Sequence, residues 1–166
     1  MNRQQVIRRV VFALVIIVLL ASVPSSLRYA YQHGGFYLFS KQFLVDLPKR
    51  LNGPGRFRFV LQPAVAIFLG IRAGIADARA GRPPYIFSLL SDGNRRWELV
   101  KEGLAEVSTL VAFAILLDAI SQWLILRAIY PGPALLVGPV LIAFPYSTSR
   151  ALTNRYRRGE KRAQAA

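Results

Sequence analysis

The chain has 166 residues, of which 54% are hydrophobic, and its 22 Lys and Arg outnumber its 8 Asp and Glu, for a formal net charge of +14. The absence of cysteine excludes disulfides, thiolate nucleophiles and iron–sulfur clusters, and a single histidine argues against haem and multi-histidine metal sites, so we expect no cofactor and no metal. In a soluble protein this charge would suggest nucleic acid as a partner. Beside long apolar segments it is more typical of membrane loops that face the cytoplasm and anionic headgroups.

Residues 1–35 form the first predicted element, a transmembrane helix. Arginines at positions 3, 8 and 9 precede an uncharged apolar segment, Val10–Leu27. A helix needs about 20 mostly apolar residues to cross a bilayer, so this segment is close to spanning length. A signal peptide is the alternative. Ala21-Ser22-Val23 is a poor cleavage site, however, because Val23 is not small.

Residues 36–56 are predicted as an interfacial amphipathic segment. Large apolar side chains recur there at helical spacing, at Phe36, Phe39, Phe43 and Leu47. Interspersed charges make the segment too polar to span, but its apolar face suits a helix that lies in the membrane interface. A helix packed on the rest of the protein explains the same pattern, so both interpretations stay open.

Residues 57–158 are predicted as one membrane unit. Phe59–Ile71 is apolar but short for a span, so it either crosses with its charged ends reaching the headgroups or forms a re-entrant or interfacial segment. An amphipathic helix starts near Arg95, has only Asp118 and Arg127 as charged residues after Glu106, and is predicted to end at Tyr130.

A helical hairpin is predicted in the C-terminal half of this unit. The turn residues Tyr130-Pro131-Gly132-Pro133 separate the preceding helix from a second long apolar segment that ends at Ser149. Residues 159–166 are predicted as a disordered basic tail.

The distribution of basic residues predicts the orientation. The cluster between Arg150 and Arg162 indicates a cytoplasmic C-terminus, and the arginines before Val10 indicate a cytoplasmic N-terminus. Two inside ends need an even number of crossings, so Phe59–Ile71 should cross as well. Three crossings with an outside N-terminus is the alternative, because the loops on both sides of Phe59–Ile71 are similarly basic. We therefore predict an all-α integral membrane helical bundle with about four transmembrane helices and an amphipathic interfacial helix.

An intramembrane polar cluster is predicted around Asp118. Asp118 and Gln122 are four residues apart, so they share one helix face. Counting about 1.5 Å per residue from the hairpin turn brings Tyr146 and Ser147 to the same depth, with Arg150 one turn deeper, and we predict that Arg150 neutralises Asp118. The predicted cluster is Asp118, Ser121, Gln122, Tyr146, Ser147 and Arg150. A structural clamp, a proton or ion path, and substrate binding are its three interpretations.

A second charged group follows the short apolar segment and comprises Arg72, Asp77, Arg79 and Arg82. The five-residue intervals on either side of Asp77 suit local helical pairs poorly, and arginine binds phosphate bidentately. We predict a cytoplasmic turn that faces lipid headgroups. Asp77-Ala78-Arg79 matches a fragment of a phosphatidyltransferase motif, but the further aspartates that would hold its metal ions are missing. No catalytic triad or phosphate-binding glycine loop can be assembled, so we predict no catalytic residue.

Six stretches carry a resemblance, and together they cover about Phe57 to Arg158. They are Leu61-Gln62-Pro63, Arg79-Ala80-Gly81-Arg82-Pro83-Pro84-Tyr85, Arg95-Arg96, Leu117-Asp118 with Gln122, Tyr130-Pro131-Gly132 and Pro145–Asn154. With these residues the chain resembles a group of small, uncharacterised bacterial integral inner-membrane proteins. The resemblance implies the bacterial cytoplasmic membrane as location and implies no particular activity.

The predicted function is that of an accessory or structural membrane protein that packs with other membrane proteins. The alternative is a small transporter or ion- or proton-conducting component that uses Asp118, which would need oligomers or a partner because four short spans enclose no route alone. A lipid-modifying enzyme that uses the Arg72–Arg82 region is the third interpretation. The expected partners are anionic lipid headgroups at the basic tail, and a membrane protein or further copies of the chain, rather than nucleic acid.

Overall fold

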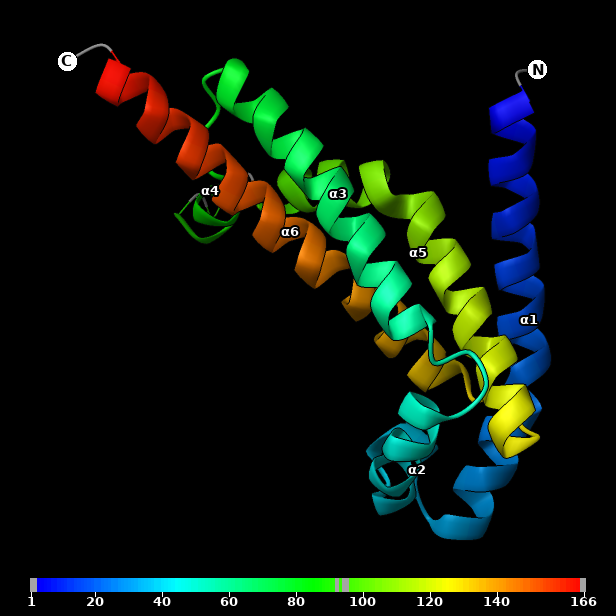
Figure 1. The fold of residues 1–166 in the computed structure, drawn as a ribbon. Helices are drawn as coiled ribbons and strands as arrows, with labels where there is room; N and C mark the ends of the chain where they lie inside the picture. Colours follow the sequence, from blue (N-terminus) through cyan, green and yellow to red (C-terminus); the bar gives the residue numbers. More distant parts are fainter. Residues whose placement is uncertain (1–2, 92, 94–95, 165–166) are drawn as a thin grey trace. The chain divides into compact units, whose positions relative to one another are not determined.

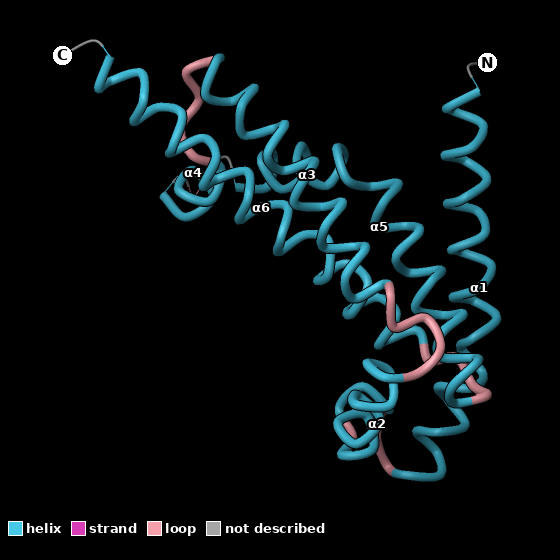
Figure 2. The backbone as a smooth tube through the Cα atoms, in the orientation of Figure 1, coloured by secondary structure: helices cyan, strands magenta, loops and turns pink. Residues whose placement is uncertain are grey.

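The computed structural model describes residues 3–91, 93 and 96–164, and every regular element among them is helical (Figure 1). Short loops join long helices (Figure 2). The prediction of an all-α chain is therefore confirmed. Four helices are long and apolar enough to cross a membrane, which is the pattern of a multi-pass membrane protein. They are α1 (Arg3–His33), α3 (Arg58–Arg79), α5 (Arg96–Leu126) and α6 (Pro131–Gln164).

The chain divides into two compact units, each assembled from separate stretches of sequence. Unit 1 comprises Met1–Val60 and Thr109–Leu141, and unit 2 comprises Leu61–Ser108 and Ile142–Ala166. Helices α3, α5 and α6 therefore each contribute residues to both units. The predicted division into consecutive segments differs from this arrangement, because a long helix meets different neighbours along its length.

Helix α1 packs through a small part of its surface. Its buried valines, Val11 and Val15, belong to the core of unit 1 together with Ala112, Ile115 and Ala134. The helix continues through the region considered as a cleavage site, where the Ser22 hydroxyl donates to the Leu19 carbonyl at 2.7 Å. It ends before Gly34, which has a φ of 70°, a left-handed conformation that glycine adopts without steric cost.

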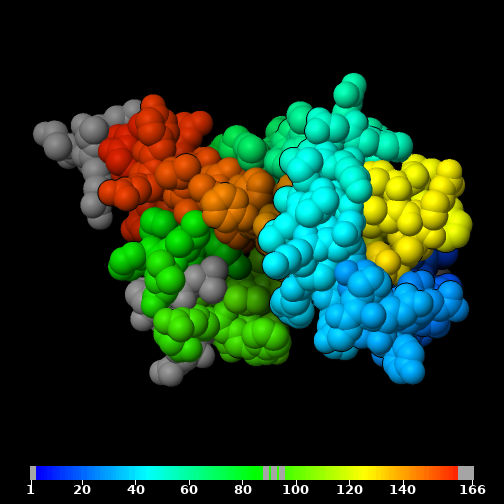
Figure 3. Space-filling view, turned by 90° about the horizontal axis from the view of Figure 1, so that it is seen from below, coloured from blue at the N-terminus to red at the C-terminus, as the bar shows by residue number. Residues whose placement is uncertain are grey.

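The segment predicted as interfacial contains a short 3₁₀ helix, η1 (Tyr37–Phe39), and helix α2 (Lys41–Asn52). The side chain of Ser40 caps α2 by accepting a hydrogen bond from the Phe43 amide at 3.2 Å. The inward face of α2 carries Phe43, Asp46 and Arg50, all buried. Figure 3 shows α2 (cyan) beside the end of α1 (blue) and the connection between α5 and α6 (yellow). The structure thus supports the open alternative of a helix packed on the protein.

The short apolar segment Phe59–Ile71 lies within the longer helix α3, whose 22 residues make it a candidate span. The helix continues beyond Ile71 to Arg79, and the acid in this extension, Asp77, is buried against basic partners in unit 2.

Helix α3 approaches α6 closely along a row of small residues in unit 2. A Cβ atom built on Gly70 would lie 2.5 Å from the Tyr146 carbonyl oxygen, and one on Gly74 would lie 2.5 Å from the Arg150 carbonyl oxygen. Ala66 and Ala78 continue this row at four-residue intervals and are 0% and 4% exposed. Such small-residue rows let membrane helices approach and gain van der Waals contact. The glycine spacing was a usable signal in the sequence, and our prediction did not use it.

The hairpin and the C-terminus differ from their predictions. Helix α5 ends at Leu126, and Pro131 is already the first residue of α6, where proline loses no hydrogen bond. The turn is therefore the stretch before the prolines, and it begins at Arg127, which has a φ of 54°. The predicted disordered tail is helical as far as Gln164, supported by an ion pair of 3.3 Å between Arg157 and Glu160 one turn apart.

Candidate functional site

The acid of α5, Asp118, is fully buried in unit 1 and meets two arginines from other elements. Arg58 of α3 donates a hydrogen bond to one carboxylate oxygen, and Nη1 of Arg50, from α2, lies 3.6 Å from the other. Nε2 of Gln122 donates to that second oxygen at 2.7 Å. Both arginine side chains are only 1% exposed. We call Arg50, Arg58, Asp118 and Gln122 the Asp118 cluster.

Neighbouring polar groups tie the Asp118 cluster to loops of unit 1. The Gln122 amide accepts a hydrogen bond from the Tyr130 backbone N–H at 2.8 Å and donates to the Tyr130 carbonyl at 3.2 Å. The Ser121 hydroxyl donates to the Pro54 carbonyl at 2.9 Å. The helix that carries Asp118 is thus fastened at this level to the chain before α3 and to the chain before α6.

Arg50 differs from the other buried cations because none of its side-chain nitrogens has a hydrogen-bond acceptor among the described residues. Its guanidinium carbon lies 5.9 Å from the centre of the Tyr37 ring and 5.5 Å from that of the Phe43 ring. Aromatic faces attract cations, more strongly when water is excluded. The rings therefore take the place of part of the lost hydration, and the cluster holds two buried positive charges against one negative charge.

A second acid supports α2 from within unit 1. Asp46 accepts hydrogen bonds from the Tyr37 hydroxyl at 2.9 Å and from Nζ of Lys49 at 2.8 Å. Burial alone would raise the pKa of Asp46, but hydrogen bonds from Lys49, Gln42 and Tyr37 outweigh it and lower this pKa below its usual value. Burial and the hydrogen bond to Asp46 raise the pKa of Tyr37, which keeps its hydroxyl protonated as a donor.

The central residue of unit 2 is Arg150, which binds two carboxylates from other helices. Its Nε and Nη2 donate to the two oxygens of Asp77 at 2.6 and 3.1 Å, a bidentate pair. Its Nη1 lies 3.4 Å from Glu106 and donates to the Tyr146 hydroxyl at 3.0 Å. The Tyr146 hydroxyl in turn donates to Glu106. We call Asp77, Glu106, Tyr146 and Arg150 the Arg150 cluster.

Helix α4 (Tyr85–Ser91) closes one side of the Arg150 cluster. The Arg150 guanidinium lies 4.6 Å from the centre of the Tyr85 ring, and the Tyr85 hydroxyl donates to the Leu99 carbonyl at 2.8 Å. Burial raises the pKa of Tyr85 against the opposing field of Arg150, so this hydroxyl stays a donor. Arg82, which is largely exposed, adds a contact of 3.3 Å to Asp77.

The predicted pairing of Asp118 with Arg150 is wrong, because each finds its partners within its own unit. Gln122 does bind Asp118, whereas Tyr146 binds Arg150 and Glu106, and Ser121 binds a loop carbonyl. Ser147 is half-buried and enters neither cluster. Counting residues from the turn gives depth along two helices, but not the direction of a side chain around each helix axis. It also leaves out cations that reach the site from other parts of the chain.

The residues of the predicted charged group between Arg72 and Arg82 lie in different environments. Asp77 is 3% exposed and belongs to the Arg150 cluster, so it does not face headgroups as predicted. Arg72 is exposed and lies 5.9 Å from the Phe68 ring, and Arg79 is exposed as well. Headgroup contact at these two arginines stays a prediction.

The side chains present in the two clusters indicate what the clusters can do chemically. Among the residues that the structure describes, no three His, Cys, Asp or Glu side chains gather as a metal site. In each cluster the central charge is held by opposite charges on other helices, which suits a connection between helices. Comparisons with protein-family models, with curated proteins and with solved structures found no match to the chain.

Proposed function

We propose that the chain is an accessory membrane protein that packs with other membrane proteins and does not itself catalyse a reaction. The observation that carries this proposal is the pairing of Asp118, which is 0% exposed and has its oxygens bound by Arg58 and Gln122. A proton or ion carrier needs exchange with water from both sides of the membrane. A carboxylate bound in this way is better suited to holding helices together.

The surface of α1 gives further support. Its buried residues are Val11, Val15 and Ser22, whereas Leu14, Ile17 and Leu20 are 46%, 60% and 65% exposed. Most of this span is therefore left for lipid or for a neighbouring protein. Lipid tails are as apolar as these side chains, so the hydrophobic effect does not drive membrane helices together. Such helices associate instead through close van der Waals packing of their surfaces.

For the location, we propose the bacterial cytoplasmic membrane. For the orientation, we propose that both chain ends lie in the cytoplasm. Four helices that are long and apolar enough to cross, together with the basic C-terminal residues, support this arrangement. The chain has no cysteine, so single-cysteine variants report accessibility without background. An impermeant thiol reagent added to intact cells should label Gly35→Cys and leave Gly159→Cys unlabelled. Protection of Gly35→Cys would favour three crossings.

The accessory role can be tested by photo-crosslinking in the native membrane. A photoreactive residue at Leu14, Ile17 or Leu20 should crosslink to one protein that also co-purifies in stoichiometric amount in mild detergent. The buried positions Val11 and Val15 are matched controls on the same helix, and they should crosslink only within the chain. A chain that purifies alone, with proton flux in vesicles that Asp118→Asn abolishes without unfolding, would contradict the proposal and favour the conducting alternative.

A further inference from the structure

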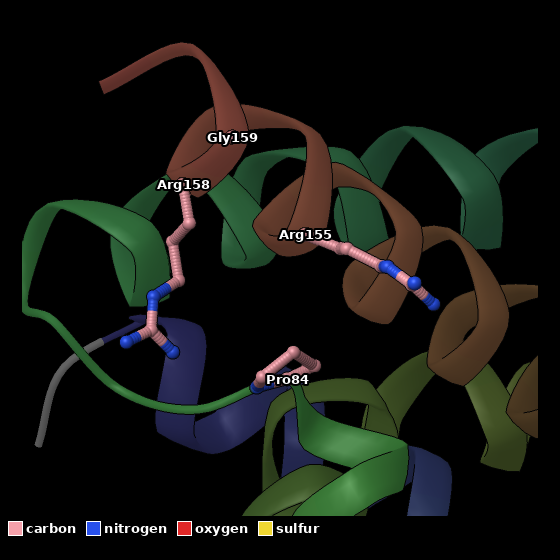
Figure 4. A pocket seen from close by; sticks show the side chains of 4 residues that line it. All are labelled: Pro84, Arg155, Arg158 and Gly159. Carbon is pink, nitrogen blue, oxygen red and sulfur yellow. The ribbon is translucent and has the colours of Figure 1, made fainter. Parts of the chain in front are cut away.

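A basic cavity lies in unit 2 where α6 passes the loop before α4. It has a volume of about 300 Å³ and is lined by Pro84, Arg155, Arg158 and Gly159 (Figure 4). The Arg158 side chain extends from α6 toward the loop, the Arg155 side chain leaves the helix in another direction, and Pro84 lies between them. Among the described residues, the lining combines two guanidinium-bearing side chains with no carboxylate.

The two arginines of this cavity have no acidic partner among the residues that the structure describes. Two acids of unit 2 are engaged elsewhere, since Asp77 binds Arg150 and Glu160 binds Arg157. Within the described part of the chain, no ion pair includes Arg155 or Arg158. Nη1 of Arg158 donates to the Arg82 carbonyl at 3.5 Å, and a guanidinium has five N–H groups, so it retains donors for a ligand. An anion with several oxygens complements such a pair of donors.

The wall of the cavity is held in place by buried contacts. The Arg82 carbonyl accepts a second hydrogen bond, from Nδ2 of Asn154 at 3.1 Å, and Asn154 is 0% exposed. Gly81 has a φ of 69°, and the Arg82 amide donates to the Asp77 carbonyl at 2.9 Å, which closes the loop after α3. The loop and α6 are therefore fastened to each other before any ligand binds.

The same turns of α6 also carry exposed apolar side chains, which favour a lipid over a soluble anion as the ligand. Leu152 and Tyr156 are 63% and 68% exposed on the span that ends at Glu160. Exposed aromatic residues with basic residues beside them are typical of the level of lipid headgroups. We propose that this cavity binds the phosphate of an anionic phospholipid, with Arg155 and Arg158 as its ligands. The assignment is independent of the accessory role.

The test is a titration of the purified full-length protein with phosphatidylglycerol, with bound lipid counted by native mass spectrometry. Arg155→Gln/Arg158→Gln should weaken apparent affinity about tenfold or more, because two charge-assisted hydrogen-bonding groups are lost. Arg72→Gln/Arg157→Gln is the matched control, which removes the same charge from exposed arginines outside the cavity. It should change affinity less than about threefold, as expected for screened surface charges.

A second pair of variants leaves both arginines in place. A Cβ added at Gly159 would meet nothing within 4 Å, so Gly159→Glu puts a carboxylate at the cavity without disturbing the packing. It should weaken binding, whereas Gly159→Gln should not. Equal losses in both double variants would overturn the assignment, as would equally tight binding of phosphatidylcholine. Displacement of the lipid by an equal concentration of inorganic phosphate would overturn the lipid as ligand.

Discussion

The two units solve the problem of buried charge in opposite ways. In unit 1, one carboxylate, Asp118, lies between two guanidinium groups, and Arg50 has no hydrogen-bond acceptor among the described residues. In unit 2, one guanidinium, Arg150, lies between two carboxylates, and each of its three nitrogens donates a hydrogen bond. Substitution of the residue at the centre of each cluster, Asp118 in unit 1 and Arg150 in unit 2, should therefore lower the free energy of unfolding most.

The largest effect is expected at Arg150. Arg150→Met leaves Asp77 buried with Arg82, an exposed side chain, as its cation. Removal of one partner from a buried pair costs about 3–5 kcal/mol in free energy of unfolding, which chemical denaturation in detergent would measure. Arg157→Met, on the exposed face of the same helix, should cost less than about 1 kcal/mol. Equal costs for both variants would show that Arg150 is not the centre of unit 2.

The corresponding substitution in unit 1 is Asp118→Asn, with an expected cost of about 3 kcal/mol because two buried cations lose their counter-charge. Arg50 makes no hydrogen bond among the described residues, so Arg50→Met should cost little alone and should restore part of the stability of Asp118→Asn. Unfolding of the two single variants and the double variant gives the coupling energy between the two residues. Strictly additive costs would mean that Arg50 does not contribute to the field at Asp118.

How much of this comparison the sequence predicts depends on whether a signal is local. Apolar length predicted the candidate spans other than α3, whose apolar segment Phe59–Ile71 is short. The four-residue interval placed Gln122 beside Asp118, because that contact follows from the geometry of one helix. The cations at Asp118 come from α2 and the start of α3. Their selection among 22 basic residues depends on tertiary packing, which periodicity does not contain. The small-residue row of α3 was a local signal, yet its partner helix could not be read from it.

Helix packing offers a smaller contrast between the units. Gly74→Ala in unit 2 would bring a Cβ to 2.5 Å from the Arg150 carbonyl oxygen, whereas Gly138→Ala in unit 1 would bring one to 3.0 Å from the Ala114 carbonyl carbon. Overpacking of this kind costs about 1–3 kcal/mol, and Gly74→Ala should lie at the upper end. Thermal unfolding of both variants measures the difference. Gly159→Ala, with open space around its Cβ, is the control and should be neutral or stabilising.

The smallest expected effect is an acid sensitivity that belongs to unit 1. The pKa of Asp46 is lowered in the folded protein from the value of 3.8 for an unperturbed carboxyl. A carboxyl with a lowered folded pKa contributes stability that is fully present above its unfolded pKa and is lost as the pH falls through its folded pKa. The melting temperature should therefore fall below pH 3.8 more steeply in the parent protein than in Asp46→Asn. The two curves should run parallel above about pH 5, where the carboxylate is charged in both states. Parallel curves in acid as well would mean that the hydrogen bonds to Asp46 persist in the unfolded chain or contribute nothing to α2.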